Sequence, residues 1–152
     1  MKETERITEL FEDLYNGNPW IDVTIVGTLK NITASQAANK VSQNWNSIWQ
    51  IVNHLINWRE NVLQRLSGQI IESPANNYIE DITDASENAW SATIQHLEET
   101  QQKWRNFLRN FDEGDFEKVY PANNGSYYKH IHGIIQHDAY HLGQVVLLAK
   151  GL

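Results

Sequence analysis

Residues 126–150 read SYYKHIHGIIQHDAYHLGQVVLLAK. Apolar residues recur in this segment at helical spacing, and no proline interrupts it. Successive helical residues are rotated by about 100°, so His137 and His141 point to the same side as Ile134 and Leu148. A long helix with an apolar stripe needs other helices to cover that stripe. We therefore expect an all-helical protein in which these two histidines face the interior.

Three more segments of the chain show the same helical spacing of apolar residues. Clusters of proline, glycine and asparagine separate the segments, and such clusters favour turns over helix. The predicted helices run roughly from Glu3 to Tyr15, from Asn44 to Leu66, from Thr83 or Asp84 onward, and from Ser126 to the C-terminus. Four long helices joined by moderate connections predict an antiparallel four-helix bundle, forming a single domain over residues 1–152.

Two smaller features complete the predicted fold. Residues 20–40 fit either a short strand, by their β-branched content, or a short helix. We favour short helical or irregular structure, because a lone strand would have no partner, and Thr33 or Ser35 is suited to cap a helix there. Gly68 is a suitable residue to end the helix that covers residues 44–66.

The composition excludes several classes of site. The chain has 152 residues and no cysteine, which excludes disulfides, thiolate metal sites and cysteine nucleophiles. Its net charge of −7 repels phosphate backbones, so we expect no nucleic-acid partner. No run of about 18 apolar residues and no signal-peptide pattern occur, so we expect a cytoplasmic protein without a membrane partner.

The spacing of His137 and His141 indicates a metal site. Histidines at positions i and i+4 of a helix project side by side, so one divalent ion can bridge them. The alternative is a pair of interior histidines, each held by a carbonyl or hydroxyl group. We favour metal ligation, because the alternative requires a separate partner for each of the two imidazoles.

A third ligand has to come from another helix, and His54 is the preferred candidate. It lies on the flank of the apolar arc in the predicted helix over residues 44–66, where the alternative is a histidine that hydrogen bonds between helices. His130 lies about 10 Å along the helix axis from His137, which is too far to share one ion. His96 and His132 are expected to face solvent.

Three nitrogen ligands leave coordination positions open, which is typical of catalytic rather than structural sites. Asp138 and Gln144 are candidates to orient the imidazoles. For Asp138 a solvated position on the helix surface is the favoured interpretation. Other residues are candidates to recognise a carboxylate or a sulfur donor, although surface or packing roles are favoured for all of them: Arg59, Arg65, Tyr127, Tyr128 and Tyr140.

Two motifs carry a resemblance to a known family. The segment HDAYHLGQ at residues 137–144, together with HLINW at residues 54–58, resembles the DinB/YfiT-like superfamily, and the likeness covers essentially the whole chain. The resemblance implies a four-helix bundle with a three-histidine site, which by motif position is His54, His137 and His141. In that family the metal is commonly zinc, nickel or another divalent ion, and homodimers are common.

The resemblance also implies candidate functions. Some members of the family use the metal to activate a low-molecular-weight thiol, so we expect a metal-dependent transferase acting on such a thiol and an electrophilic small molecule. One alternative is a non-catalytic bundle that binds a small ligand or a protein. Another is a hydrolase that uses metal-bound hydroxide. The sequence assigns no catalytic residue beyond the ligands.

Overall fold

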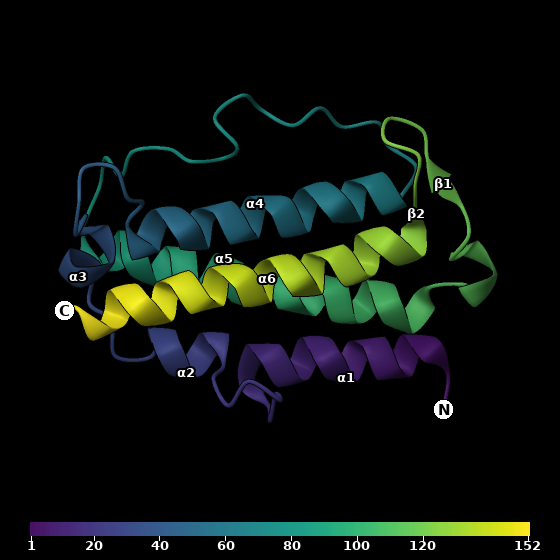
Figure 1. The fold of residues 1–152 in the computed structure, drawn as a ribbon, viewed down its shortest axis with the longest axis horizontal. Helices are drawn as coiled ribbons and strands as arrows, with labels where there is room; N and C mark the ends of the chain where they lie inside the picture. Colours follow the sequence, from purple (N-terminus) through teal and green to yellow (C-terminus); the bar gives the residue numbers. More distant parts are fainter.

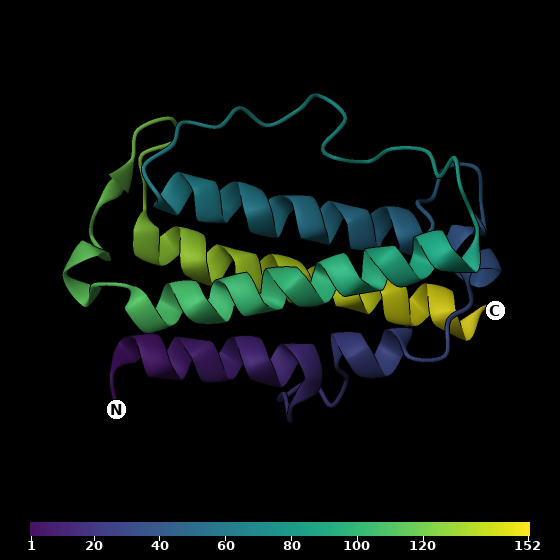
Figure 2. The ribbon, with the colours of Figure 1, turned by 180° about the vertical axis from the view of Figure 1, so that it is seen from behind.

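Four long helices form the bundle in the computed structural model, which describes residues 1–152 (Figure 1). They are α1 (Glu3–Asn16), α4 (Ile48–Leu66), α5 (Glu87–Asn110) and α6 (Tyr127–Lys150). α4 packs against α5 and α6, and α1 packs against α5 and α6. α1 and α6 run in one direction, and α4 and α5 run in the other (Figures 1 and 2). The predicted all-α bundle is confirmed.

The remaining elements are short. They are α2 (Ile25–Leu29), α3 (Ala34–Ala38), the 3-10 helix η1 (Glu113–Asp115) and the strands β1 (Val119–Tyr120) and β2 (Gly125–Ser126). α2 and α3 confirm the expectation of short helices in residues 20–40, and Thr33 caps α3 as predicted. The two strands form an antiparallel hairpin in which Val119 faces Ser126. Strands of two residues are too short to show the alternation of apolar and polar residues by which a strand is predicted from sequence.

Serine side chains set the starts of three long helices. Ser47, Ser86 and Ser126 each accept a hydrogen bond from the backbone N–H three residues on, which satisfies one of the unpaired donors of a helix N-terminus. The predicted start of α5 at Thr83 or Asp84 is therefore wrong. The Asp84 carboxylate instead accepts the Ser86 N–H in the turn before the helix.

α4 begins later than predicted, but it ends at Leu66 as predicted. It begins at Ile48 rather than Asn44, because Ser47 provides the cap. Ser67 ends the helix, and Gly68 follows with a φ of +86°, a left-handed backbone conformation that favours glycine.

A polar layer crosses the bundle between two apolar clusters. One cluster, near the C-terminal end of α6, contains residues such as Trp49, Trp90 and Leu142. The other, near the N-terminal end of α6, contains residues such as Trp104 and Ile131. Between them α4, α5 and α6 contribute polar side chains that are at most 1% exposed, namely Arg59, Thr100, Gln101 and Asp138.

Residues 67–86 form a long crossover that runs back along the outside of α4 (Figures 1 and 2). Loops of this length without secondary structure are uncommon in compact domains and are usually functional. Side chains of α4 hold the crossover, including Trp58, whose Nε1 donates to Asn77 Oδ1 at 2.9 Å, and Asn61, whose Nδ2 donates to the Tyr78 hydroxyl at 2.8 Å. Asn77 and Tyr78 both have left-handed backbone angles, with φ of 54° and 58°.

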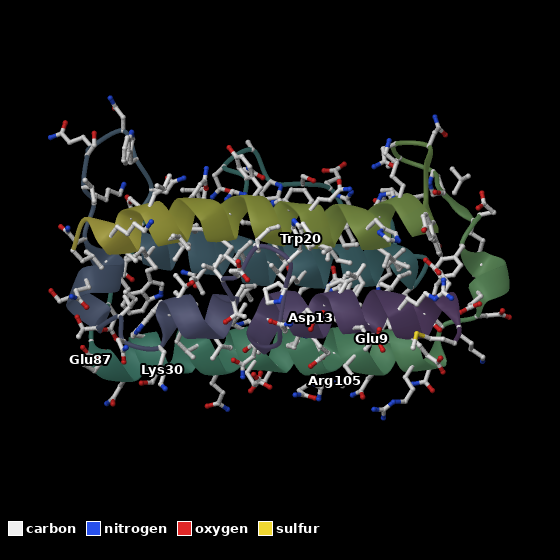
Figure 3. All side chains as sticks on the ribbon, turned by 60° about the horizontal axis from the view of Figure 1, so that its bottom comes forward. Glu9, Asp13, Trp20, Lys30, Glu87 and Arg105 are labelled. Atoms are coloured by element: carbon white, nitrogen blue, oxygen red, sulfur yellow. The ribbon has the colours of Figure 1, made fainter.

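The opposite side of the bundle carries charged side chains (Figure 3). Figure 3 looks onto α1, α2 and α5, where charged side chains such as Glu9, Asp13 and Arg105 project outward. Arg105 pairs with Glu12 across α1 and α5. Trp20, in the connection between α1 and α2, is 99% exposed. No helix of the structure is both long enough and apolar enough to cross a membrane.

Candidate metal centre

The buried face of α6 is centred on Asp138 rather than on the two histidines. The residues of α6 that are buried are Ile131, Ile134, Asp138, Leu142, Val145 and Leu148. His137 and His141 lie at one flank of this face and are only partly buried, with 25% of the His137 side chain exposed. The expectation that both point into the bundle is corrected: they line the seam between α6 and α4.

Three histidine side chains meet in this seam. His54 from α4 is 2% exposed and faces the pair on α6. Its Nε2 atom lies 2.9 Å from His137 Nε2 and 3.0 Å from His141 Nε2. Metal-ligating atoms of the three residues all lie within 4.8 Å of one another, which makes them a group that could hold one ion. The structure thus brings together the three histidines that the sequence singled out.

Hydrogen bonds fix the proton positions of two of these rings. His54 Nδ1 lies 2.7 Å from the backbone carbonyl of Asn77, which can only accept, so this nitrogen carries the proton and donates. His141 Nδ1 likewise donates to Gln144 Oε1 at 2.7 Å. The Nε2 atoms of both rings therefore present lone pairs to each other. Lone pairs at about 3 Å repel, and a cation between them would turn that repulsion into ligation.

The third ring has an unusual environment. His137 Nδ1 is buried and has no hydrogen-bond partner, and the same is true of Asp138 Oδ1. The two atoms are 3.7 Å apart, just beyond hydrogen-bonding distance. The other carboxylate oxygen, Asp138 Oδ2, accepts from Arg59 Nε at 2.8 Å. A fully buried carboxylate thus lies beside the three imidazoles and favours positive charge there.

Burial keeps two of the histidines in the neutral form that a metal requires. Loss of hydration lowers the pKa of His54 to about 4, and it also lowers the pKa of His141. Each imidazole raises the cost of charging its neighbours, which adds to the effect. Near neutral pH, protons therefore compete weakly with a metal ion for the Nε2 atom of His54.

The lowered pKa of His54 predicts an acid-sensitive stability for the metal-free protein. The unfolded chain binds a proton at about pH 6.5, whereas the folded chain does so only near pH 4. Between these values the unfolded state holds more protons, so the free energy of unfolding falls as the pH falls from 6.5 towards 4. We expect a loss of about 2–4 kcal/mol from this residue, measured by urea unfolding in the presence of a chelator.

Two substitutions test that assignment. His54→Gln should flatten the pH profile between 6.5 and 4.5, whereas His96→Gln should leave it unchanged, because His96 is exposed and pairs only with Glu60. Parallel profiles for the wild type and His54→Gln would contradict the assignment.

The other polar residues considered in the sequence analysis occupy different positions in the structure. Gln144 orients His141, as expected for a residue behind a ligand. His130 is occupied by the Ser126 carbonyl and by Asn123, away from the cluster. His132 was expected to face solvent, but its Nε2 is buried without a partner and its ring packs against Tyr128.

Asp138 was wrongly expected at the surface, and Arg59, for which a surface or packing role was expected, is buried. Asp138 and Arg59 are both 0% exposed and pair with each other, because each neutralises the charge of the other inside the bundle. Arg65, at 9% exposed, is also buried. Asn77 was not identified from the sequence at all. It lies far from His54 along the chain, and no spacing pattern connects the two.

Two pockets border the cluster. A pocket of about 420 Å³ touches His137 and is lined by residues that include Trp58, Arg65, Lys129 and Ile134. A second pocket, of about 320 Å³, touches Gln144 and has Trp45, Ile51 and Leu147 in its wall. Neither pocket has a carboxylate among its lining residues. The cluster therefore has space beside it for a small molecule.

Comparison with known proteins gives one family. A family model described as the DinB superfamily matches residues 24–145, which is well over half of the chain and includes all three histidines. No curated protein matches the chain.

Proposed function

This chain belongs to the DinB superfamily, and we propose that His54, His137 and His141 hold a divalent metal ion, zinc or nickel, that serves a thiol-dependent transferase. The observation that carries the proposal is the convergence of three Nε2 atoms, of which two have their Nδ1 protons committed elsewhere. Neutral imidazoles with the second nitrogen hydrogen bonded are the usual form of histidine ligands.

The surrounding residues hold the ligands in place. Asn77 fixes His54 from the crossover, Gln144 fixes His141 from the next turn of α6, and the buried Asp138 lies behind His137. A divalent ion in such a three-nitrogen site leaves positions open and lowers the pKa of a thiol or water molecule bound there. The seam between α4 and α6, with a pocket at His137, gives a small molecule access to that position.

The lining of the pockets favours thiol chemistry over hydrolysis. A metal ion lowers the pKa of bound water from about 15.7 only to about 7, and a general base commonly assists its attack, whereas a thiol has a pKa of about 8.5 even when free and forms the nucleophilic thiolate more readily on a metal. Neither pocket has a carboxylate in its wall, and the Asp138 carboxylate, which accepts from Arg59 through Oδ2, lines neither of them. The site thus holds its ligands firmly but offers no evident base to deprotonate water.

An activity measurement tests the transferase proposal. Zinc- or nickel-loaded protein is expected to accelerate the reaction of a low-molecular-weight thiol with monobromobimane or 1-chloro-2,4-dinitrobenzene. His54→Ala should reduce the metal-dependent rate at least about a hundredfold, because a ligand worth about 3 kcal/mol is lost. The matched control is His96→Ala, which removes an exposed histidine and should leave the rate unchanged. A rate in the loaded protein equal to that of thiol and metal alone would contradict the proposal.

A further inference from the structure

We infer that the pocket beside His137 binds an anionic oxygen group, a carboxylate or a phosphate, of the small molecule that reacts at the metal centre. The assignment of this ligand to the reaction rests on the proposed function. The anion site itself rests on the pocket and its side chains, and it can be tested in the metal-free protein. Arg65 is the central residue of this site.

Arg65 has hydrogen-bonding capacity that the fold does not use. It is only 9% exposed, yet its Nε is buried without a partner. The single hydrogen bond of its side chain runs from Nη2 to Ser73 Oγ, at 3.0 Å, and no carboxylate lies within ion-pairing distance of it. A buried guanidinium normally has an acidic partner, as Arg59 has in Asp138. The missing partner of Arg65 points to a ligand.

Aromatic rings hold the Arg65 guanidinium in a fixed place. Its central carbon lies 5.4 Å from the centre of the Trp58 ring and 5.0 Å from that of Tyr120. Stacking of this kind restricts the side chain without neutralising its charge. The planar group is therefore preorganised to meet a carboxylate or phosphate, which it matches with two parallel hydrogen bonds.

Lys129 supplies a second positive charge at the same pocket. Its ammonium group has no ion-pair partner, and the pocket wall contains no acidic residue. Two other polar residues of the wall are already occupied, since His130 bonds to Asn123 and to the Ser126 carbonyl. An anion in this pocket would therefore be held by Arg65 and Lys129. This local charge is opposite to the net charge of −7 of the whole chain.

The distance from Arg65 to the histidines sets the size of the ligand. The Trp58 ring lies 5.4 Å from the guanidinium carbon and 6.1 Å from the centre of the His137 ring, so the two ends of the site are at most about 12 Å apart. A small molecule with an anionic group at one end and a thiol at the other, separated by a chain of about six carbon atoms, fits this span.

The first experiment uses metal-free protein and nuclear magnetic resonance. The Nε–H signal of Arg65, assigned through Arg65→Lys, is followed during titration with hexanoate, hexyl phosphate and hexan-1-ol. Hexanoate or hexyl phosphate should shift the signal, and whichever binds more tightly identifies the preferred group. Hexan-1-ol should leave it in place. Equal responses to the charged and the uncharged probes would overturn the anion site.

The second experiment uses cobalt-loaded protein, whose visible spectrum reports thiol binding. 6-Mercaptohexanoate should bind at least about tenfold more tightly than 6-mercaptohexan-1-ol. This ratio of affinities corresponds to the free energy that one hydrogen bond to a charged group usually contributes. Lys129→Gln, at an exposed position, should reduce this preference severalfold, and Arg65→Lys should reduce it further. Lys150→Gln, at the far end of α6, is the matched control and should not change it.

The two experiments separate the two proposals. Probe binding to the metal-free protein, without cobalt uptake, would retain the anion site and reject the metal-dependent function. Equal binding of both thiols to the cobalt-loaded protein would retain the metal site and overturn the anion site.

Discussion

His137→Ala is expected to abolish stable zinc binding. Zinc sites with four protein ligands bind with about 10–16 kcal/mol, or about 3 kcal/mol for each ligand, so loss of one ligand should weaken binding about a hundredfold or more. His137 is suited to this test because its ring is partly exposed and its Nδ1 has no hydrogen bond to lose. The measurement is calorimetric titration of the chelator-treated, untagged protein with zinc.

The control for this substitution is His130→Ala. His130 lies on the same helix, nearly two turns away, and its nitrogens are occupied by the Ser126 carbonyl and Asn123. The control should retain the zinc affinity of the wild type. If His130→Ala lost as much affinity as His137→Ala, zinc would be binding to scattered histidines of α6 and not to the cluster.

Arg59→Met is expected to destabilise the protein by about 3–5 kcal/mol, which is the usual cost of removing one partner from a buried ion pair. Arg59 and Asp138 are both 0% exposed, and their side chains meet at 2.8 Å in the polar layer. Without the guanidinium, the carboxylate would be left uncompensated inside the bundle. Urea unfolding at pH 7 measures the change.

A second substitution shows whether the loss comes from the unpaired charge. In the double variant Arg59→Met/Asp138→Leu, neither charge is buried, so much of the lost stability should return. If the double variant were destabilised by the sum of the losses in Arg59→Met and Asp138→Leu, that result would contradict the ion-pair interpretation. The double variant should also bind metal about tenfold more weakly, because the carboxylate behind His137 is gone.

The helices and the pair His137 and His141 were predictable because they depend on local spacing. The recurrence of apolar residues in residues 126–150 gives a helix, and the i, i+4 spacing of His137 and His141 places them together whatever the rest of the fold does. His54, on the flank of the apolar arc of its predicted helix, was preferred because His96 was expected to face solvent and His130 to lie too far from His137. All three then meet in the structure.

The polar parts of the site could not be predicted, because they depend on partners far away in the sequence. A single aspartate on a helix is usually solvated, and only Arg59, on another helix, makes the burial of Asp138 tolerable. Since Asp138 was counted as a surface residue, the buried face of α6 was placed too far towards the histidines. Asn77 lies in a crossover without any periodic pattern, so its contact with His54 had no signal in the sequence.

The position of the cluster in the seam has a functional consequence. Histidines at the centre of the bundle would be closed off by the two apolar clusters, whereas His137 at the flank borders a pocket. The buried ion pair supports the cluster from the inside, and the crossover supports it from the outside through Asn77. The buried side of α6 therefore stabilises the histidine cluster, and its flank gives a small molecule access to the cluster.

Metal analysis of the untagged protein tests the three-histidine site most directly. Protein is purified without a histidine tag, stripped with a chelator, incubated with zinc or nickel, and freed of excess metal before elemental analysis and X-ray absorption spectroscopy. One ion for each chain, with three imidazole nitrogens in its coordination shell, is the predicted result. Protein that contains no metal as purified and takes up neither zinc nor nickel would contradict it.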